Sequence, residues 1–167
     1  MYYADASRVC LEPCVPYGWQ FPDEDVFMPS AKGKGLNCFG LLTRTNKLMF
    51  STTTQNINST FVFEYLDRLS FMLEKPTVIV LDNASVHTAK IIQQQRNVWE
   101  ERGLTLFYLP PHSPQLNLIE ILWKMLKYYW LKPEDYVEEQ LLFYKITLAL
   151  AAVGSSLNIN FSDLALV

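Results

Sequence analysis

Two continuous apolar runs in the middle of the chain constrain its fold more than any other feature. The first is "TVIVLD" (77–82), and the second is "LTLFYLP" (104–110). Apolar runs of this length, rich in β-branched or aromatic residues, are typical of strands that are buried on both faces of a sheet. The segment between them, "TAKIIQQQRNVWEERG" (88–103), is predicted as a helix that ends at a glycine. Strand, helix and strand in this order predict a β-α-β unit.

Shorter patterns on either side of this unit complete the predicted architecture. The chain opens with a predicted strand, "YYADAS" (2–7). After a proline-rich turn, further short segments have strand character and predict a three-strand β-meander: "GWQF" (18–21), "LNCFGLLT" (36–43) and "KLMFSTTT" (47–54). Helices are predicted at 58–73, in the stretch that runs to about Trp130, and at 134–154. The order βββαβαβαα predicts an α/β fold with a mixed sheet and flanking helices.

Length and composition fit a single globular domain. The chain has 167 residues, of which 50% are hydrophobic and 19% are charged, so it can build a sizeable core. No apolar run approaches the roughly 18 residues that cross a bilayer, and the N-terminus lacks a signal-peptide pattern. We therefore expect a cytoplasmic protein without a membrane partner. Its cysteines, odd in number and without a CxxC pair, favour reduced packing residues over a disulfide framework or a zinc site: Cys10, Cys14 and Cys38.

The distribution of charge permits DNA binding although the net charge is −3. Residues 26–132 contain twelve Lys or Arg and seven Asp or Glu, which is a local balance of +5. The acidic residues concentrate outside this segment, at "PDED" (22–25) and "PEDYVEE" (133–139), and we interpret both runs as solvated surface. Because phosphate contacts need Lys and Arg, the basic middle of the chain is compatible with a nucleic-acid partner without requiring one.

Three acidic residues stand out by their placement. Asp82 ends a predicted buried strand, Glu120 lies in the first turn of the helix after the next strand, and Asp5 lies in the first strand. If the first strand neighbours the strand that ends at Asp82, all three carboxylates meet at one end of the sheet. Clustered carboxylates repel one another unless a cation neutralises them, and oxygen ligands suit Mg²⁺ or Mn²⁺. The pattern therefore indicates a divalent metal site for phosphoryl transfer.

Each of these residues also has a purely structural interpretation. Asp82 and Asn83 both favour turns, because their side chains bond to nearby backbone. Asn117 and Glu120 form N-x-x-E, a variant of the capping box. His87 either orients Asp82 or a phosphate, or it caps and packs like most histidines near a helix start. Taken one at a time, the structural interpretations are favoured.

Two lysines and four tryptophans are further candidates. Lys124 and Lys127 follow Glu120 by four and seven positions, so all three share one helix face. One interpretation is that the two lysines bind phosphate, and the other is that they form part of a solvated face. For each lysine taken alone, the second interpretation is favoured. The tryptophans are interpreted first as core or interface residues and second as platforms for stacked bases: Trp19, Trp99, Trp123 and Trp130.

Two longer motifs change this balance when they are taken together. "VIVLDNASVH" (78–87) and "LPPHSPQLNLIEILWKMLK" (109–127) resemble the signature segments of mariner-like transposases. The resemblance is greatest to the bacterial insertion-sequence branch of that group, within the DDE superfamily of endonucleases. The family pattern is roughly "DNAxxH" followed by "LPPYSPxLNPIExxWxxLK". The 37 residues between Asp82 and Glu120 lie in the range that such enzymes use. The resemblance covers most of the chain and implies a ribonuclease-H-like fold.

The resemblance implies roles for individual residues. Asp5, Asp82 and Glu120 correspond to the first, second and third catalytic acids, which hold two Mg²⁺ or Mn²⁺ ions. Trp19 fits the family's tryptophan after the first acid and supports Asp5, whereas the acidic cluster 23–25 is the rival for that role. Three places depart from the pattern: Ala6-Ser7-Arg8 follow Asp5 where the family usually has a glutamate and then a Ser-Gly pair, Leu118 replaces a proline, and His112 replaces a tyrosine. The remaining candidates are supporting or DNA-backbone residues: Asn83, His87, Asn117, Lys124 and Lys127.

The implied function is metal-dependent DNA strand cleavage and strand transfer in DNA transposition. The implied partners are transposon ends, target DNA and a second copy of the chain in the active complex. Members of the family carry helix-turn-helix modules before the catalytic domain, and we expect residues 1–167 to be the catalytic domain without that region. Two alternatives stay open at this point. One is a standalone ribonuclease-H-like nuclease, and the other is an inactive remnant that only binds DNA or a partner subunit.

Overall fold

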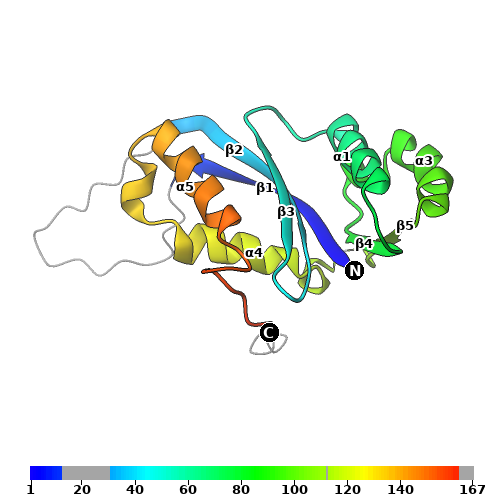
Figure 1. Ribbon diagram of the computed structural model, residues 1–167. Coiled ribbons are helices and arrows are strands. Elements are labelled where there is room, and N and C mark those ends of the chain that lie inside the picture. The colour runs from blue at the N-terminus through cyan, green and yellow to red at the C-terminus, as the bar shows by residue number, and fades with distance from the viewer. Residues whose placement is uncertain (13–30, 112, 162–167) are drawn as a thin grey trace, which may run out of the picture.

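The described part of the chain is built around one mixed sheet (Figure 1). The computed structural model describes residues 1–12, 31–111 and 113–161. Within them, five strands lie in the order β3-β2-β1-β4-β5. Their bounds are β1 Tyr2–Leu11, β2 Ala31–Leu42, β3 Leu48–Thr53, β4 Thr77–Leu81 and β5 Leu104–Tyr108. β1, β2 and β3 pair antiparallel, whereas β1, β4 and β5 pair parallel, so the predicted mixed sheet is confirmed.

The antiparallel half of the sheet differs from the predicted meander in its extent. β2 begins at Ala31, earlier than the predicted segment 36–43, and it pairs with β1 on one side and β3 on the other. Asn46, with a φ of 61°, makes the turn between β2 and β3. Its side chain is fixed by two hydrogen bonds to the backbone of Ile159, at 2.7 and 3.0 Å. The predicted strand segment "GWQF" (18–21) lies outside the described residues.

Two longer helices, α1 and α3, cover one face of the sheet. α1 is Ser59–Phe71, and Asn58 caps it by accepting a hydrogen bond from the Phe61 amide at 2.9 Å, as the predicted helix start requires. The helix predicted over 88–103 is α3 (Lys90–Glu101), and a separate short helix, α2 (Ser85–Thr88), precedes it. Ala89, with a ψ of 150°, is extended and separates them, which composition alone did not indicate.

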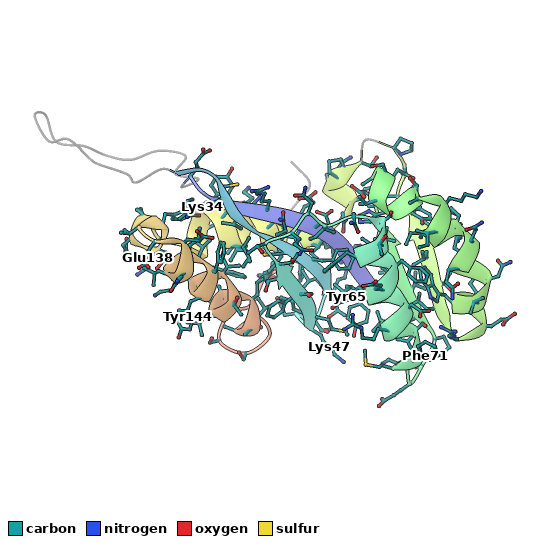
Figure 2. The ribbon with its side chains drawn as sticks, turned by 90° about the horizontal axis from the view of Figure 1, so that it is seen from above. Lys34, Lys47, Tyr65, Phe71, Glu138 and Tyr144 are labelled. Carbon is teal, nitrogen blue, oxygen red and sulfur yellow. The ribbon has the colours of Figure 1, made fainter. Side chains whose placement is uncertain are left out.

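The other face is covered by α4, which is Ile119–Met125, and by α5, which is Glu139–Ala151. A π-helical turn, Leu126–Trp130, continues α4 and brings the helical segment to the predicted end at Trp130. The helix predicted over 134–154 is shorter, because Pro133–Tyr136 form a 3-10 turn and Glu138 is extended. Lys34 on β2 and Glu139 form an ion pair at 2.8 Å. Figure 2 shows Lys34 near Glu138, the residue directly before α5.

Alternation along the strands divides the core into two clusters, one on each face. Tyr3, Val80 and the buried residues of α4 and α5 belong to one cluster. Ala4, Ile79 and the buried residues of α1 and α3 belong to the other. Successive side chains of a strand point to opposite faces, so both faces must be apolar and covered. Trp99 and Trp123 are buried core residues, as predicted, and Cys38 is a buried free cysteine. Among the described residues, no helix is both long and apolar enough to cross a membrane.

Candidate active site

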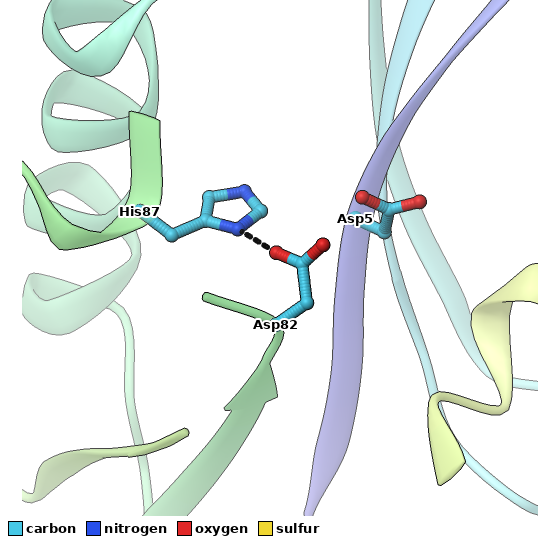
Figure 3. A group of neighbouring side chains, drawn as sticks. All are labelled: Asp5, Asp82 and His87. Atoms are coloured by element: carbon cyan, nitrogen blue, oxygen red, sulfur yellow. Dashed lines mark hydrogen bonds and ion pairs between the residues drawn. The ribbon is translucent and has the colours of Figure 1, made fainter. Parts of the chain in front are cut away.

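The register of two parallel strands brings Asp5 and Asp82 together. Tyr3 on β1 is aligned with Val80 on β4, and both side chains lie in the core cluster that α4 covers. Asp5 and Asp82 each follow two residues later, and residues two positions apart on a strand share a face. The two carboxylates are therefore at the same level, on the face that α4 covers. Figure 3 shows them facing one another from β1 and from the end of β4.

Asp5 is the most deeply placed of the three carboxylates, at 9% exposure. The indole Nε1 of Trp123 donates a hydrogen bond to Asp5 Oδ2 at 3.1 Å. Gly40, which is paired with Asp5 in the sheet, leaves space for the Trp123 ring, because a Cβ at this position would lie 3.1 Å from that ring. Burial, followed by the negative charge of Glu120, raises the pKa of Asp5 to about 7. An ionised Asp5 is thus unfavourable until a positive charge approaches.

Asp82 has the opposite electrostatic setting. His87 Nδ1 lies 2.6 Å from Asp82 Oδ1, and the Ala84 amide donates to the same oxygen at 3.1 Å. The hydrogen bond from His87 lowers the pKa of Asp82, although partial burial opposes this. The side chain of Asn83 donates to the Leu109 carbonyl, which ties the end of β4 to the segment after β5. Asp82 is therefore ionised and fixed, while its other carboxylate oxygen remains on the Asp5 side.

His87 is held rigidly enough to orient Asp82. Its side chain is completely buried, and its ring lies 6.4 Å from that of Phe39. The Tyr108 hydroxyl donates to the His87 carbonyl at 2.7 Å, which fixes its backbone. Nε2 has no hydrogen-bond partner among the described residues. A neutral imidazole with its proton on Nδ1 satisfies this geometry, since Nδ1 can then donate to Asp82. Of the two roles considered from the sequence, orientation of Asp82 fits the structure.

Glu120 lies in the first turn of α4 but does not cap the helix. The N-cap residue is Leu118, and no side-chain capping bond is present at this helix start. The N-x-x-E capping interpretation is therefore wrong. Although the Glu120 side chain is exposed, partial desolvation and the charge of Asp82 raise the pKa of its carboxyl, and Lys127 opposes them. Glu120 is thus electrostatically coupled to both Asp5 and Asp82.

Asn117 connects the start of α4 to β1. It is buried, and its Nδ2 donates to the Ala4 carbonyl at 3.1 Å, next to Asp5 on β1. Its Oδ1 meets no hydrogen-bond partner in the described part of the chain. Asn117 thus holds the start of α4 against β1. Leu118 already has helical dihedral angles, with φ −61° and ψ −21°, so the absence of proline does not disturb the helix start.

The donor atoms at this edge of the sheet fit a hard divalent cation. Oxygen or nitrogen atoms of Asp5, Asp82 and His87 all lie within 4.8 Å of one another. Glu120 is not part of that group, so its side chain would complete the site from the first turn of α4. Two carboxylates at close range, one with a raised pKa, are unfavourable without a counter-charge, and oxygen donors are the preferred ligands of Mg²⁺ and Mn²⁺.

Some expectations fall outside the described residues, and two contacts were not foreseen. Trp19, the acidic cluster 23–25 and His112 lie outside the described part of the chain. The bond from Trp123 to Asp5 was missed, because the tryptophan was interpreted only as a core or interface residue. Gly40 was also missed, although a glycine within a predicted strand often marks a close approach of another element.

Comparison with known families identifies the class of protein. The family model for "DDE superfamily endonuclease" matches residues 1–141. The chain therefore belongs to this family of endonucleases, whose members use divalent metal ions. A comparison with curated protein sequences found no significant match.

Solved structures support the same fold. The chain is similar to Mos1 transposase in a paired-end complex with the left transposon end, with 13% identity and a TM-score of 0.59 over 90% of this chain and 52% of that chain. It is also similar to the intasome of simian T-cell lymphotropic virus in complex with a PP2A regulatory subunit, with 15% identity and a TM-score of 0.60 over 82% of this chain and 49% of that chain. The chain thus spans about half the length of these structures and shares their ribonuclease-H-like fold.

Proposed function

We propose that this chain is the catalytic domain of a transposase, which cleaves DNA strands and joins the freed ends to target DNA. The observation that carries the proposal is the close approach of Asp5 and Asp82, whose ligand atoms lie within 4.8 Å of one another and of His87, beside Glu120. Mos1 transposase in complex with a transposon end, and in a strand transfer complex, supports DNA as the substrate through its similar fold.

Asp5, Asp82 and Glu120 are the proposed catalytic acids and metal ligands. Two Mg²⁺ or Mn²⁺ ions bound there would activate a water or a 3′-hydroxyl and stabilise the leaving oxygen. His87 and the Ala84 amide hold one oxygen of Asp82, and Trp123 holds one oxygen of Asp5. These bonds hold the carboxylates of Asp5 and Asp82 in place beside one another. A Mos1 paired-end complex with Mn is among the similar structures and is compatible with this assignment.

The proposed partners follow from the same comparison. DNA is the substrate, as transposon ends and as target, and a second copy of the chain completes the active complex. We also propose that residues 1–167 act as one catalytic domain and that end recognition comes from helix-turn-helix modules elsewhere. In a bacterial cell this domain would act on DNA of the nucleoid.

The products of the reaction test the proposal. Purified chain is incubated with duplex DNA that has a pre-nicked, recessed end, in Mn²⁺, Mg²⁺ or a chelator, and the labelled strands are separated on a denaturing gel. Joined strands longer than the substrate are expected with metal. Nicks without joined strands would favour a standalone nuclease, and neither product, from a chain that also fails to bind Mn²⁺, would indicate an inactive remnant. Asp82→Asn should abolish both products, whereas Glu101→Gln, which changes an exposed carboxylate on α3, should not.

A further inference from the structure

A groove begins at Glu120 and runs along the end of the α4 segment. Its volume is about 630 Å³, and it is lined by Glu120, Trp123, Lys124, Lys127, Tyr128 and Tyr129. Glu120 and Trp123 belong to the candidate active site, so the groove is continuous with that site. The other four residues have no role in holding the proposed metal ions.

Helical geometry explains why these residues share one face. Lys124, Lys127 and Tyr128 follow Glu120 by four, seven and eight positions, which is the spacing of one face of an α-helix. Tyr129 would lie beside this face in a regular helix. The chain is π-helical here, and the Leu131 amide donates to the Leu126 carbonyl at 3.1 Å, five residues back. Tyr129 also lines the groove, and π-turns of this kind are frequent at functional sites.

The two tyrosine rings that line the groove are exposed to solvent. Tyr128 is 45% and Tyr129 is 64% exposed. Among the described residues, neither ring stacks on another ring or on a cation. Phe71 provides a contrast, since it is 68% exposed but is covered by the Arg102 guanidinium at 3.9 Å. The cationic side chains of Lys124 and Lys127 lie in the same groove.

We propose that this groove binds single-stranded DNA that leaves the active site, with bases stacked on Tyr128 and Tyr129 and phosphates bound by Lys124 and Lys127. This inference rests on the proposed function, because the groove is continuous with Glu120. Exposed aromatic rings beside cationic side chains are the common means of binding single strands, since every base has a face that can stack. In a duplex these faces are covered by neighbouring base pairs, so the groove selects unpaired strands.

Binding of a labelled oligothymidine, measured by fluorescence anisotropy in chelator, tests the inference without requiring catalysis. The variants are Tyr128→Ala with Tyr129→Ala, and the same two positions changed to Phe. Stacking is worth roughly 1–3 kcal/mol per base, and the alanine variant removes two stacking rings, so it should bind at least about 30-fold more weakly. The phenylalanine variant keeps the rings and should bind like the wild type. Lys127→Ala should weaken binding and reduce its dependence on salt.

Tyr144→Ala is the matched control. Tyr144 is 62% exposed on α5, and Figure 2 shows it on the outer side of that helix. Its removal should leave binding unchanged. The inference is overturned if the wild type does not bind oligothymidine, if the Tyr144 variant loses as much affinity as the groove variant, or if the groove variant binds normally. If the groove variant loses as much affinity for a blunt duplex as for oligothymidine, the proposed preference for single strands is also overturned.

The outcomes separate this inference from the proposed function. If the wild-type chain cleaves no DNA but the groove variant loses oligothymidine binding, the groove inference is supported and the transposase proposal is contradicted. If the wild-type chain cleaves and joins DNA and the groove variant binds oligothymidine and cleaves normally, the transposase proposal is supported and the groove inference is contradicted.

Discussion

The indole of Trp123 donates to the carboxylate of Asp5 across 3.1 Å, and this bond joins residues 118 positions apart in sequence. It links the helix that carries Glu120 to the strand that carries Asp5. Both partners are largely buried, so the bond holds the Asp5 carboxylate in one orientation. The order of the candidate site therefore depends on a residue that does not itself bind an ion.

Trp123→Phe should weaken Mn²⁺ binding at pH 8 by roughly tenfold. Phenylalanine retains most of the ring packing but removes the N–H, and changes in groups that orient metal ligands typically cost 10- to 100-fold in affinity, as an order of magnitude. Titration of Mn²⁺ followed by electron paramagnetic resonance measures the affinity. Trp99→Phe is a matched control, because Trp99 is also buried and donates to Asp67 at 3.0 Å on the other face of the sheet. That control should lose stability but keep its Mn²⁺ affinity, and equal affinities in all three proteins would contradict the role of Trp123.

His87→Phe should raise the pKa of Asp82 and weaken Mn²⁺ binding. The bond from His87 is the main cause of the lowered pKa of Asp82, so its loss makes this carboxylate easier to protonate. Phenylalanine fills the space beside Phe39 without offering a donor. The same Mn²⁺ titration, repeated from pH 5 to pH 8, should show the largest loss of affinity at the acidic end. A variant whose affinity matches the wild type at every pH would show that His87 only packs.

Asp5 should make the metal-free chain less stable as the pH rises. Burial raises the pKa of Asp5 to about 7, so between pH values near 4 and 7 the unfolded chain loses this proton while the folded chain keeps it. The free energy of unfolding therefore falls across this window, by about 4 kcal/mol at most, and levels off above it. Asp5→Asn removes the effect, so its stability advantage over the wild type should grow from pH 4 to pH 7.

Urea unfolding of both proteins in chelator, at several pH values, measures this difference. Saturating Mn²⁺ at pH 8 should stabilise the wild type and leave Asp5→Asn largely unaffected, since a ligand that binds only the folded state stabilises it. Parallel stability profiles for the two proteins would show that Asp5 titrates near its ordinary pKa.

The sequence predicted the mixed sheet because its signals are local. The apolar runs 77–82 and 104–110 match β4 and β5 closely, and Asn58 begins α1 as its residue type favours. The break at Ala89 and the 3-10 turn Pro133–Tyr136 were not predicted. Alanine is a strong helix former, so its extended conformation between α2 and α3 reflects tertiary contacts that outweigh propensity.

The candidate site was predictable only in part. The condition that the first strand neighbours the strand of Asp82 was stated from the sequence, and the pairing of β1 with β4 confirms it. Support for the site comes from longer-range contacts. The bonds from Trp123 to Asp5 and from Asn117 to the Ala4 carbonyl span 118 and 113 positions, and no local pattern encodes such pairs. From the sequence, Asn117 was considered as a helix cap and as a supporting or DNA-backbone residue, and the structure shows that it ties α4 to β1.

Glu120→Gln tests the central claim most directly. Glutamine keeps the shape of the side chain and removes its negative charge. The helix start has no side-chain capping bond, so the substitution should not weaken α4. Desolvation, followed by the charge of Asp82, raises the pKa of this carboxyl, so removal of its charge should leave the metal-free melting temperature unchanged or slightly higher.

The decisive measurement is Mn²⁺-dependent cleavage of a pre-nicked DNA end by this variant, alongside thermal melts with and without Mn²⁺. We expect normal folding in chelator, loss of the Mn²⁺-induced rise in melting temperature, and loss of cleavage. A variant that melts earlier than the wild type in chelator and still cleaves DNA at the wild-type rate would contradict the account, because Glu120 would then serve the helix and not the chemistry.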